Sequence, residues 1–240
     1  MAERRPAHLL EIKGLNVYYG RSHALQGVDL TLAHGVLSLV GRNGMGKTTL
    51  CKAIVGLTRA ASGSVRFMGE ELIGRTPAEI ARLGLSYVPQ GRRLWPTVTV
   101  DEHLRLAGGN RGQWTIARIY DTFPRLAERR SNRGNQLSGG EQQMLAIARA
   151  LIGNPSVVLM DEPSEGLAPV IVEELARAVK RLAATEGLTM ILVEQNTRLA
   201  LDISPRTAVM DRGRIVFDGP SDELRRDPDK LHRLIGVGKG

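Results

Sequence analysis

The chain has 240 residues, of which 42% are apolar and 24% are charged, and it carries a formal net charge of +8. This composition is ordinary for a folded globular protein, and a single cysteine excludes a disulfide within the chain. No apolar stretch approaches the roughly 18–20 residues that a membrane-spanning helix requires. Charged residues interrupt the apolar residues near the start, so we expect no secretory signal and a cytoplasmic protein.

Nucleic acid is not an expected partner, although the chain is basic. The arginines are scattered along the sequence, and aromatic residues make up only 4% of it, which is few for base-stacking platforms. A basic surface next to an anionic membrane or an acidic partner fits the charge equally well.

Short apolar runs predict the fold class. "VLSLV" (36–40), "SVVLM" (156–160) and "MILV" (190–193) lack polar alternation, which is typical of strands buried on both faces of a parallel sheet. Helical patterns follow the first two runs. We therefore predict an α/β fold, a parallel sheet flanked by helices. The β-rich pieces at 9–35, 63–69 and 207–217 predict an antiparallel sheet at one side.

The segment from 91 to 153 predicts helices. One begins at the capping box Thr99-x-x-Glu102, a second covers about 115–130, and a third begins at Ser138-x-x-Glu141. We expect one domain over 1–240, in which 1–90 and 154–240 form the core and 91–153 form a helical insertion.

The stretch "GRNGMGKTT" matches the phosphate-binding pattern G-x-x-x-x-G-K-[ST] between an apolar strand and a helix. Its backbone N–H groups are expected to line an anion nest. Lys47 is expected to reach the β- and γ-phosphates, and the Thr48 hydroxyl to ligate Mg²⁺. A glycine-rich turn with an exposed lysine is the alternative. The candidate nucleotide-binding residues are Gly41, Arg42, Asn43, Gly44, Met45, Gly46, Lys47, Thr48 and Thr49.

Two carboxylates end the second apolar run. Because ligands bind beyond the carboxyl ends of parallel strands, Asp161 is a candidate Mg²⁺ ligand. Glu162 is a candidate general base for water, a role that is typically worth about 10²–10⁴-fold in rate. The alternative is a pair of carboxylates on a solvated turn.

The stretch "LSGGEQQ" (137–143) predicts a second anion-seeking helix start, but one without a lysine. A capping box that merely begins a helix is the alternative. That alternative leaves Gly139 and Gly140 without a purpose, since a glycine inside a helix costs up to about 1 kcal/mol relative to alanine.

These motifs, with Gln90 in "YVPQGRR", occur in the order and approximate spacing of the ATP-binding subunits of ABC transporters, which the chain resembles from about residue 8 to 220. The resemblance implies ATP and Mg²⁺ as ligands and two such subunits that face each other head to tail. Ser138, Gly139, Gly140 and Glu141 would then meet the ATP held by the facing subunit.

The resemblance also assigns single residues. Tyr19 would stack on adenine, unless it is a core tyrosine. Gln90 would touch Mg²⁺ or water, unless it is a plain surface glutamine. Lys47, Glu162 and Gln195 would be the catalytic residues.

Two positions depart from the family pattern. Gln195 stands where a histidine usually contacts the γ-phosphate, so we expect no rate inflection near pH ~6.5 from this position. None of the five histidines is expected to replace it. Ala168 stands where many members carry an aspartate, which puts signalling through that carboxylate in doubt.

With these departures, "VPQGRRLWPTVTVDEHL", "DEPSEGLAP" and "ILVEQN" resemble the ATP-binding subunits of importers for branched-chain amino acids, or for urea and short amides. The resemblance implies an ATPase coupled to transport, peripheral on the cytoplasmic face of the inner membrane. Its partners would be a second copy or a related ATP-binding subunit, two permease subunits contacted by the helical insertion, and, indirectly, a periplasmic solute-binding protein. A non-transport ABC ATPase acting on nucleic acid and a P-loop small-molecule kinase are the rival functions.

Overall fold

The computed structural model describes residues 8–108 and 112–236. Residues 1–7, on which part of the prediction about a secretory signal falls, lie outside the described residues, as do both ends of the predicted 1–240 domain. No helix within the described ranges is long and apolar enough to cross a membrane.

A six-stranded sheet forms the centre of the molecule, with strand order β10-β9-β3-β8-β7-β6. The first five strands in chain order run parallel, and β10 pairs antiparallel with β9 at one edge. The three predicted apolar strands are therefore confirmed as β3, β7 and β8. The bounds are β3 Val36–Val40, β6 Leu85–Val88, β7 Val157–Asp161, β8 Thr189–Glu194, β9 Arg206–Asp211 and β10 Arg214–Pro220.

Both faces of this sheet are covered, which explains why its strands lack polar alternation. Successive side chains of a strand point to opposite faces. In β7, Val157 and Leu159 join the hydrophobic core around α1 (Lys47–Ile54), whereas Val158 and Met160 join the core around α6 (Gly139–Leu151).

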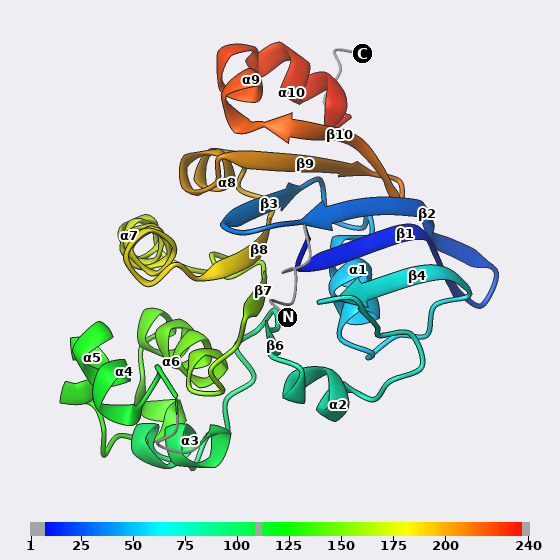
Figure 1. Ribbon diagram of the computed structural model, residues 1–240. Coiled ribbons are helices and arrows are strands. Elements are labelled where there is room, and N and C mark those ends of the chain that lie inside the picture. Colours follow the sequence, from blue (N-terminus) through cyan, green and yellow to red (C-terminus); the bar gives the residue numbers. More distant parts are fainter. Residues whose placement is uncertain (1–7, 109–111, 237–240) are drawn as a thin grey trace, which may run out of the picture.

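A second, antiparallel sheet of order β2-β1-β4-β5 packs on the far side of α1 (Figure 1). Its strands are β1 Leu10–Tyr19, β2 Ser22–Leu32, β4 Ser62–Phe67 and β5 Glu70–Glu71. The prediction that 207–217 belongs to this sheet is wrong, since β9 and β10 complete the edge of the central sheet. The "DRGR" turn does connect an antiparallel pair, but β9 also pairs in parallel with β3, a long-range contact that the turn does not encode.

Helices between β6 and β7 form a group at one side of the central sheet, drawn in green in Figure 1, and α6 packs this group against the sheet. The capping boxes at Thr99 and Ser138 are both present. The single helix expected over 115–130 is two helices, because Phe123 precedes a proline and adopts φ −124° and ψ 74°. The group comprises α3 Val100–Ala107, α4 Ile116–Thr122, α5 Pro124–Glu128, a 3₁₀ turn at Gly134–Gln136, and α6.

The remaining helices cover the sheet outside this group. α7 and α8 pack on the same face as α6, and α9 and α10 pack near the β9–β10 end of the sheet. The bounds are α2 Pro77–Arg82, α7 Pro169–Glu186, α8 Thr197–Ile203, α9 Ser221–Arg226 and α10 Pro228–Leu234.

Candidate functional site

The glycine-rich loop runs from the end of β3 into α1, and its glycines are required by geometry. Gly46 is the N-cap of α1 and has a φ of +106°, a left-handed value that favours glycine. A Cβ atom at Gly41 would lie 2.3 Å from the backbone oxygen of Met210. The sequence therefore folds here into a tight turn whose backbone opens onto a helix N-terminus.

Lys47 and Glu162 form a buried ion pair beneath this loop. The Lys47 Nζ lies 3.0 Å from Glu162 Oε1, and the two side chains are only 3% and 7% exposed. The same Nζ donates to the backbone oxygens of Gly41 at 2.8 Å and Arg42 at 3.1 Å. An exposed lysine on a plain turn is thus excluded, because Lys47 is held against the loop by three oxygen atoms.

Asp161 lies fully buried at the end of β7 and is bonded from two sides. The Thr48 hydroxyl donates to Oδ1 at 3.1 Å, and the Tyr87 hydroxyl donates to Oδ2 at 2.9 Å. Burial raises the pKa of Asp161, and these hydrogen bonds and nearby Lys47 oppose the rise. With Glu162 8% exposed, the alternative of a solvated turn is excluded.

A cavity of about 600 Å³ opens above these residues. Tyr19 stands at its rim, 49% exposed, so it is not a core tyrosine. His23 also lines the cavity, which the sequence did not suggest, and its ring stacks on Tyr18 at 4.1 Å between centroids. The lining residues are Tyr19, Ser22, His23, Ala24, Gln26, Asn43, Gly44, Gly46, Lys47, Thr48, Thr49, Gln90, Glu162, Arg212 and Gly213.

The start of α6 lies outside this cavity, since none of residues 138–141 is among its lining residues. Ser138 is exposed, accepts the Glu141 N–H with its hydroxyl oxygen at 3.3 Å, and donates its own N–H to the Glu141 carboxylate at 2.8 Å. Partial burial by itself would raise the pKa of Glu141. The bonds to Ser138 and the interaction with Arg129 outweigh this effect, so the pKa is lowered.

The two glycines of this helix start have structural reasons as well, which corrects our expectation that a capping box alone would leave them without a purpose. A Cβ atom at Gly140 would lie 2.6 Å from Ile171 Cγ2 on α7. One at Gly139 would lie 3.1 Å from Arg92 Nη1. The helix start therefore combines a close packing contact at buried Gly140 with an exposed serine at Ser138.

Comparisons with known proteins agree with this geometry. Residues 25–165 match the family model described as "ABC transporter". The chain belongs to the ABC transporter family. It is 40% identical over 233 residues to BraG of Pseudomonas aeruginosa, named as a high-affinity branched-chain amino acid transport ATP-binding protein, and the match covers 95% of this chain and 100% of BraG.

Solved ATP-binding cassettes share the fold over nearly the whole chain. A nucleotide-free cassette from an ABC transporter aligns with a TM-score of 0.83 and 26% identity, covering 97% of this chain and 100% of that one. A dimeric cassette in a post-hydrolysis state bound to ADP and Pi aligns with a TM-score of 0.76 and 25% identity, covering 88% and 98%. This chain is accordingly an ATP-binding cassette, and ATP hydrolysis is the activity of its family.

The cassette brings most predicted residues together and leaves others apart. Gln90 lines the cavity and donates from Nε2 to Glu165 Oε2 at 2.8 Å. Gln195 is exposed just beyond β8 and does not line the cavity, and Ala168 is the exposed N-cap of α7. Arg42 and Met45 are not lining residues either, although Arg42 gives its carbonyl oxygen to Lys47.

Three side chains with direct bonds around the site were not predicted. Tyr87 holds Asp161. Arg92 reaches from the loop after Gln90 to Gln142 Oε1 at 3.3 Å and to the backbone oxygen of Glu165 at 3.4 Å. Glu194 is 1% exposed and accepts hydrogen bonds from Ser164. Of these three, only Glu194 could have been identified from the sequence, because it follows an apolar run as Asp161 does.

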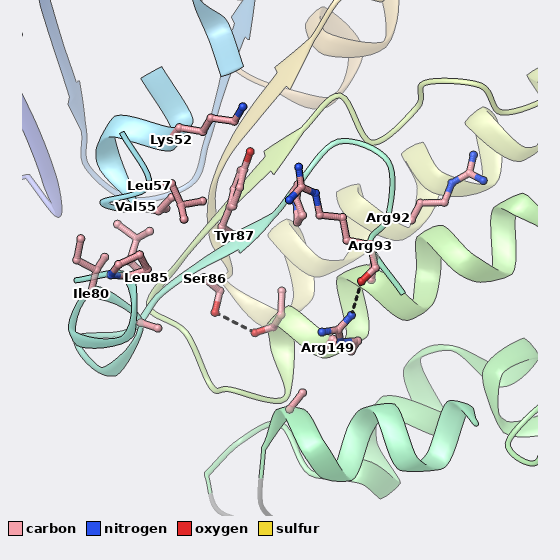
Figure 2. A pocket seen from close by; sticks show the side chains of 16 residues that line it. Lys52, Val55, Leu57, Ile80, Leu85, Ser86, Tyr87, Arg92, Arg93 and Arg149 are labelled. Atoms are coloured by element: carbon pink, nitrogen blue, oxygen red, sulfur yellow. Dashed lines mark hydrogen bonds between the residues drawn. The ribbon is translucent and has the colours of Figure 1, made fainter. Parts of the chain in front are cut away.

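A second cavity, of about 450 Å³, lies where the helical group meets the core. Figure 2 shows apolar side chains, among them Leu57 and Ile80, together with a set of basic ones. No carboxylate is among the described residues that line it. Its basic residues are Lys52, Arg92, Arg93 and Arg149.

Proposed function

We propose that this chain is the ATP-hydrolysing subunit of an importer for branched-chain amino acids. The name of BraG favours this cargo over urea or a short amide. The observation that carries the proposal is the exposed, capped start of α6, which lies outside the nucleotide cavity of its own chain. Each chain has a phosphate-binding loop and, at a separate place, a helix N-terminus suited to bind an anion. Two such chains could therefore bind each ATP between the loop of one and the helix N-terminus of the other.

Oxygen-bearing side chains at and behind the cavity wall fit Mg²⁺. Thr48 and Gln90 line the cavity with a hydroxyl and an amide oxygen, and buried Asp161 lies behind Thr48, its carboxylate oxygen 3.1 Å from the Thr48 hydroxyl. Mg²⁺ prefers such oxygen ligands and usually binds through one or two protein groups together with substrate phosphates. When bound, the ion would neutralise charge on the β- and γ-phosphates.

The chain's own groups would bind the triphosphate and take up a proton. The backbone N–H groups of residues 43–48 would hold the phosphates at the N-terminus of α1, and Tyr19 would offer its ring to the adenine. A γ-phosphate that approaches Lys47 competes with Glu162 for the ammonium group. Glu162 would then be released to accept a proton from the attacking water, and Gln195 would act as a neutral amide donor.

When ATP binds, two subunits would move together and close around the nucleotide. Ser138, Gly139 and Gly140 of one chain would contact the γ-phosphate held by the other. A similar cassette that is dimeric with ADP and Pi bound supports the pairing of two cassettes. The second chain would be another copy or a related ATP-binding subunit. ATP can drive this change only because it binds the closed pair more tightly than the open one.

The helical insertion, residues 91–153, would receive the permease. The basic, partly apolar cavity in Figure 2 lies between this insertion and the core. A cytoplasmic loop of a membrane subunit that binds there would be displaced when the insertion moves relative to the core. Two permease subunits would place the cassette on the cytoplasmic face of the inner membrane. A periplasmic solute-binding protein would act through them.

The dimer is tested by Glu162→Gln, which removes the proposed base and keeps the side-chain shape. Size-exclusion chromatography with light scattering should show a monomer without nucleotide and a stable dimer with ATP and Mg²⁺. Lys47→Ala in the same background should remain monomeric at all ATP concentrations. If Glu162→Gln stays monomeric at saturating ATP, sharing of the nucleotide between two copies of this chain fails.

The cargo is tested separately by uptake. Cells that lack this chain should lose uptake of labelled leucine, isoleucine and valine and regain it with the wild-type chain but not with Glu162→Gln. Loss of urea uptake with leucine uptake intact would select the alternative cargo.

A further inference from the structure

The central strand β8 ends between the two motifs that hold the nucleotide. It pairs with β3, which leads into the phosphate loop, and with β7, which ends in Asp161. Val40 is in register with Glu194, and Asp161 is in register with Val193. The carboxylate of Glu194 therefore lies at the catalytic edge of the sheet, one residue past the register of Asp161.

Glu194 is 1% exposed, and its hydrogen-bond donors are neutral. Ser164 donates its N–H to Oε1 at 3.1 Å and its hydroxyl to Oε2 at 2.8 Å, and the Asn196 N–H lies 3.4 Å from Oε2. Burial raises the pKa of Glu194, and the bonds from Ser164 and Asn196 oppose the rise. Because desolvating a carboxylate is costly without such partners, this group is tied to the loop after β7.

The loop after β7 contains a residue in an unfavourable backbone conformation. Glu162 has a φ of +49°, which is uncommon for a residue with a side chain and costs about 1–3 kcal/mol where it occurs. The Glu162 N–H donates to the Val193 oxygen at 2.8 Å, and the Glu165 N–H donates to the Glu162 oxygen at 3.1 Å. The turn 162–165 is thus held against β8 by Val193 at one end and by Glu194, through Ser164, at the other.

We propose that Glu194 is a positioning residue for hydrolysis, which acts through Ser164 to hold the turn that presents Glu162 to the attacking water. Its bond from Asn196 also fixes the residue that follows Gln195. This inference rests on the proposed role of Glu162 as the base. The proposed role of the Glu194 carboxylate, to hold the turn 162–165 in place, differs from the phosphate binding proposed for the loop and from the metal binding proposed for Asp161.

The test compares Glu194→Ala with Glu194→Gln in the full-length chain under single-turnover conditions. Misplacing a catalytic group by about 1 Å can cost about 10²-fold, so Glu194→Ala should lower the hydrolysis rate by about 10- to 100-fold. The KM for ATP should change less than twofold, since the phosphate loop is untouched. Glu194→Gln should restore most of the rate, because its amide can accept the Ser164 N–H and donate to the Ser164 hydroxyl, losing only the longer bond from the Asn196 N–H at 3.4 Å.

A double-mutant cycle with Glu162→Gln separates positioning from a merely structural role. In the Glu162→Gln background, Glu194→Ala should not lower the residual hydrolysis further. A wild-type rate in Glu194→Ala, an equal loss in both backgrounds, a rise in KM without loss of rate, or no rescue by glutamine would each overturn the inference.

A third variant keeps the inference testable if Glu194→Ala does not fold. Ser164→Ala removes only the hydroxyl bond, so it should lower the rate severalfold at constant KM, and a wild-type rate would overturn the proposal. If Glu162→Gln itself hydrolyses ATP at the wild-type rate, the role proposed for Glu162 fails instead. The two failures are therefore distinguishable.

Discussion

The phosphate-loop edge of the sheet and the start of α6 both offer helix N-termini to an anion, yet they are built differently. At the first, Lys47, Asp161 and Glu162 are buried; Lys47 pairs with Glu162, and Asp161 accepts the Thr48 hydroxyl. At the second, Ser138 is exposed and its bonds within the structure serve the capping box with Glu141. The first region carries the charges that chemistry needs, whereas the second offers backbone donors and a hydroxyl beside the capping carboxylate of Glu141.

This difference indicates that the two regions are half-sites with different functions: the half-site around Lys47, Asp161 and Glu162 and the half-site at the start of α6. A buried set of ionised groups must be assembled within one chain, because leaving any member unpaired is costly. An exposed helix start has no such constraint and can be completed by a ligand on another chain. The predictions below test whether the two regions behave as separately built parts of one site, from the largest expected effect to the smallest.

Lys47→Ala should have the largest effect, because it leaves the Glu162 carboxylate buried without its cation. Breaking a buried ion pair in this way typically costs about 3–5 kcal/mol. Urea unfolding should show a loss of this order, and equilibrium dialysis should show that ATP no longer binds. Adding Glu162→Gln should recover much of the stability but none of the ATP binding. Unchanged stability in Lys47→Ala would contradict the buried pair.

Ser138→Ala should separate the structural role of the helix start from its role toward ATP. Loss of an N-cap hydroxyl typically costs about 1 kcal/mol. Thr99→Ala is the matched control, since Thr99 caps α3 with the same box and lies outside both half-sites. Both variants should lose similar stability, and only Ser138→Ala should lose hydrolysis, by about 10²-fold if the hydroxyl stabilises the transition state. Equal hydrolysis in the two variants would remove Ser138 from the site.

Gly140→Ala and Gly139→Ala should differ in stability although they are neighbours. The added methyl group at 140 meets Ile171 at 2.6 Å, so this overpacking should cost about 1–2 kcal/mol. At 139 it meets the movable guanidinium of Arg92, and the change should stay within about 0.5 kcal/mol. Thermal unfolding of both variants measures the difference, and similar midpoints would show that Gly140 is not a packing contact.

Glu141 should make a small pH-dependent contribution to stability. Its folded-state pKa is lowered below 4.5, so its stabilisation is present above about pH 4.5 and is lost as the pH falls through the folded value. Glu141→Gln keeps a capping-box side chain without this titration. The stability difference between wild type and Glu141→Gln, measured by urea unfolding, should therefore shrink on acidification below pH 4.5. A difference that is constant with pH would contradict this.

The sequence predicted the parts of the molecule that depend on local pattern. The central strands β3, β7 and β8 follow from apolar runs, and the capping boxes of α3 and α6 follow from residues three positions apart. The phosphate loop follows from its glycine spacing. Each of these signals lies within one short stretch, so no knowledge of the fold was needed to interpret it.

Contacts between distant segments could not be predicted in this way. Tyr87 and Asp161 are joined across 74 positions of sequence, and Gly140 meets Ile171 on another helix. The place of β9 in the central sheet depends on its pairing with β3, which a turn motif does not encode. The roles of Gln195, Gln90 and the start of α6 toward ATP remain predictions, since they depend on the nucleotide and on a second chain.

The most direct test of the two half-sites is a mixture of two inactive variants. Lys47→Ala retains an intact helix start, and Ser138→Arg retains an intact phosphate loop. If each ATP is shared between chains, a mixed dimer contains one fully intact site, and the mixture should hydrolyse ATP although neither variant does so alone. If the mixture stays as inactive as its components while the wild-type chain is active at the same concentration, the shared site is contradicted.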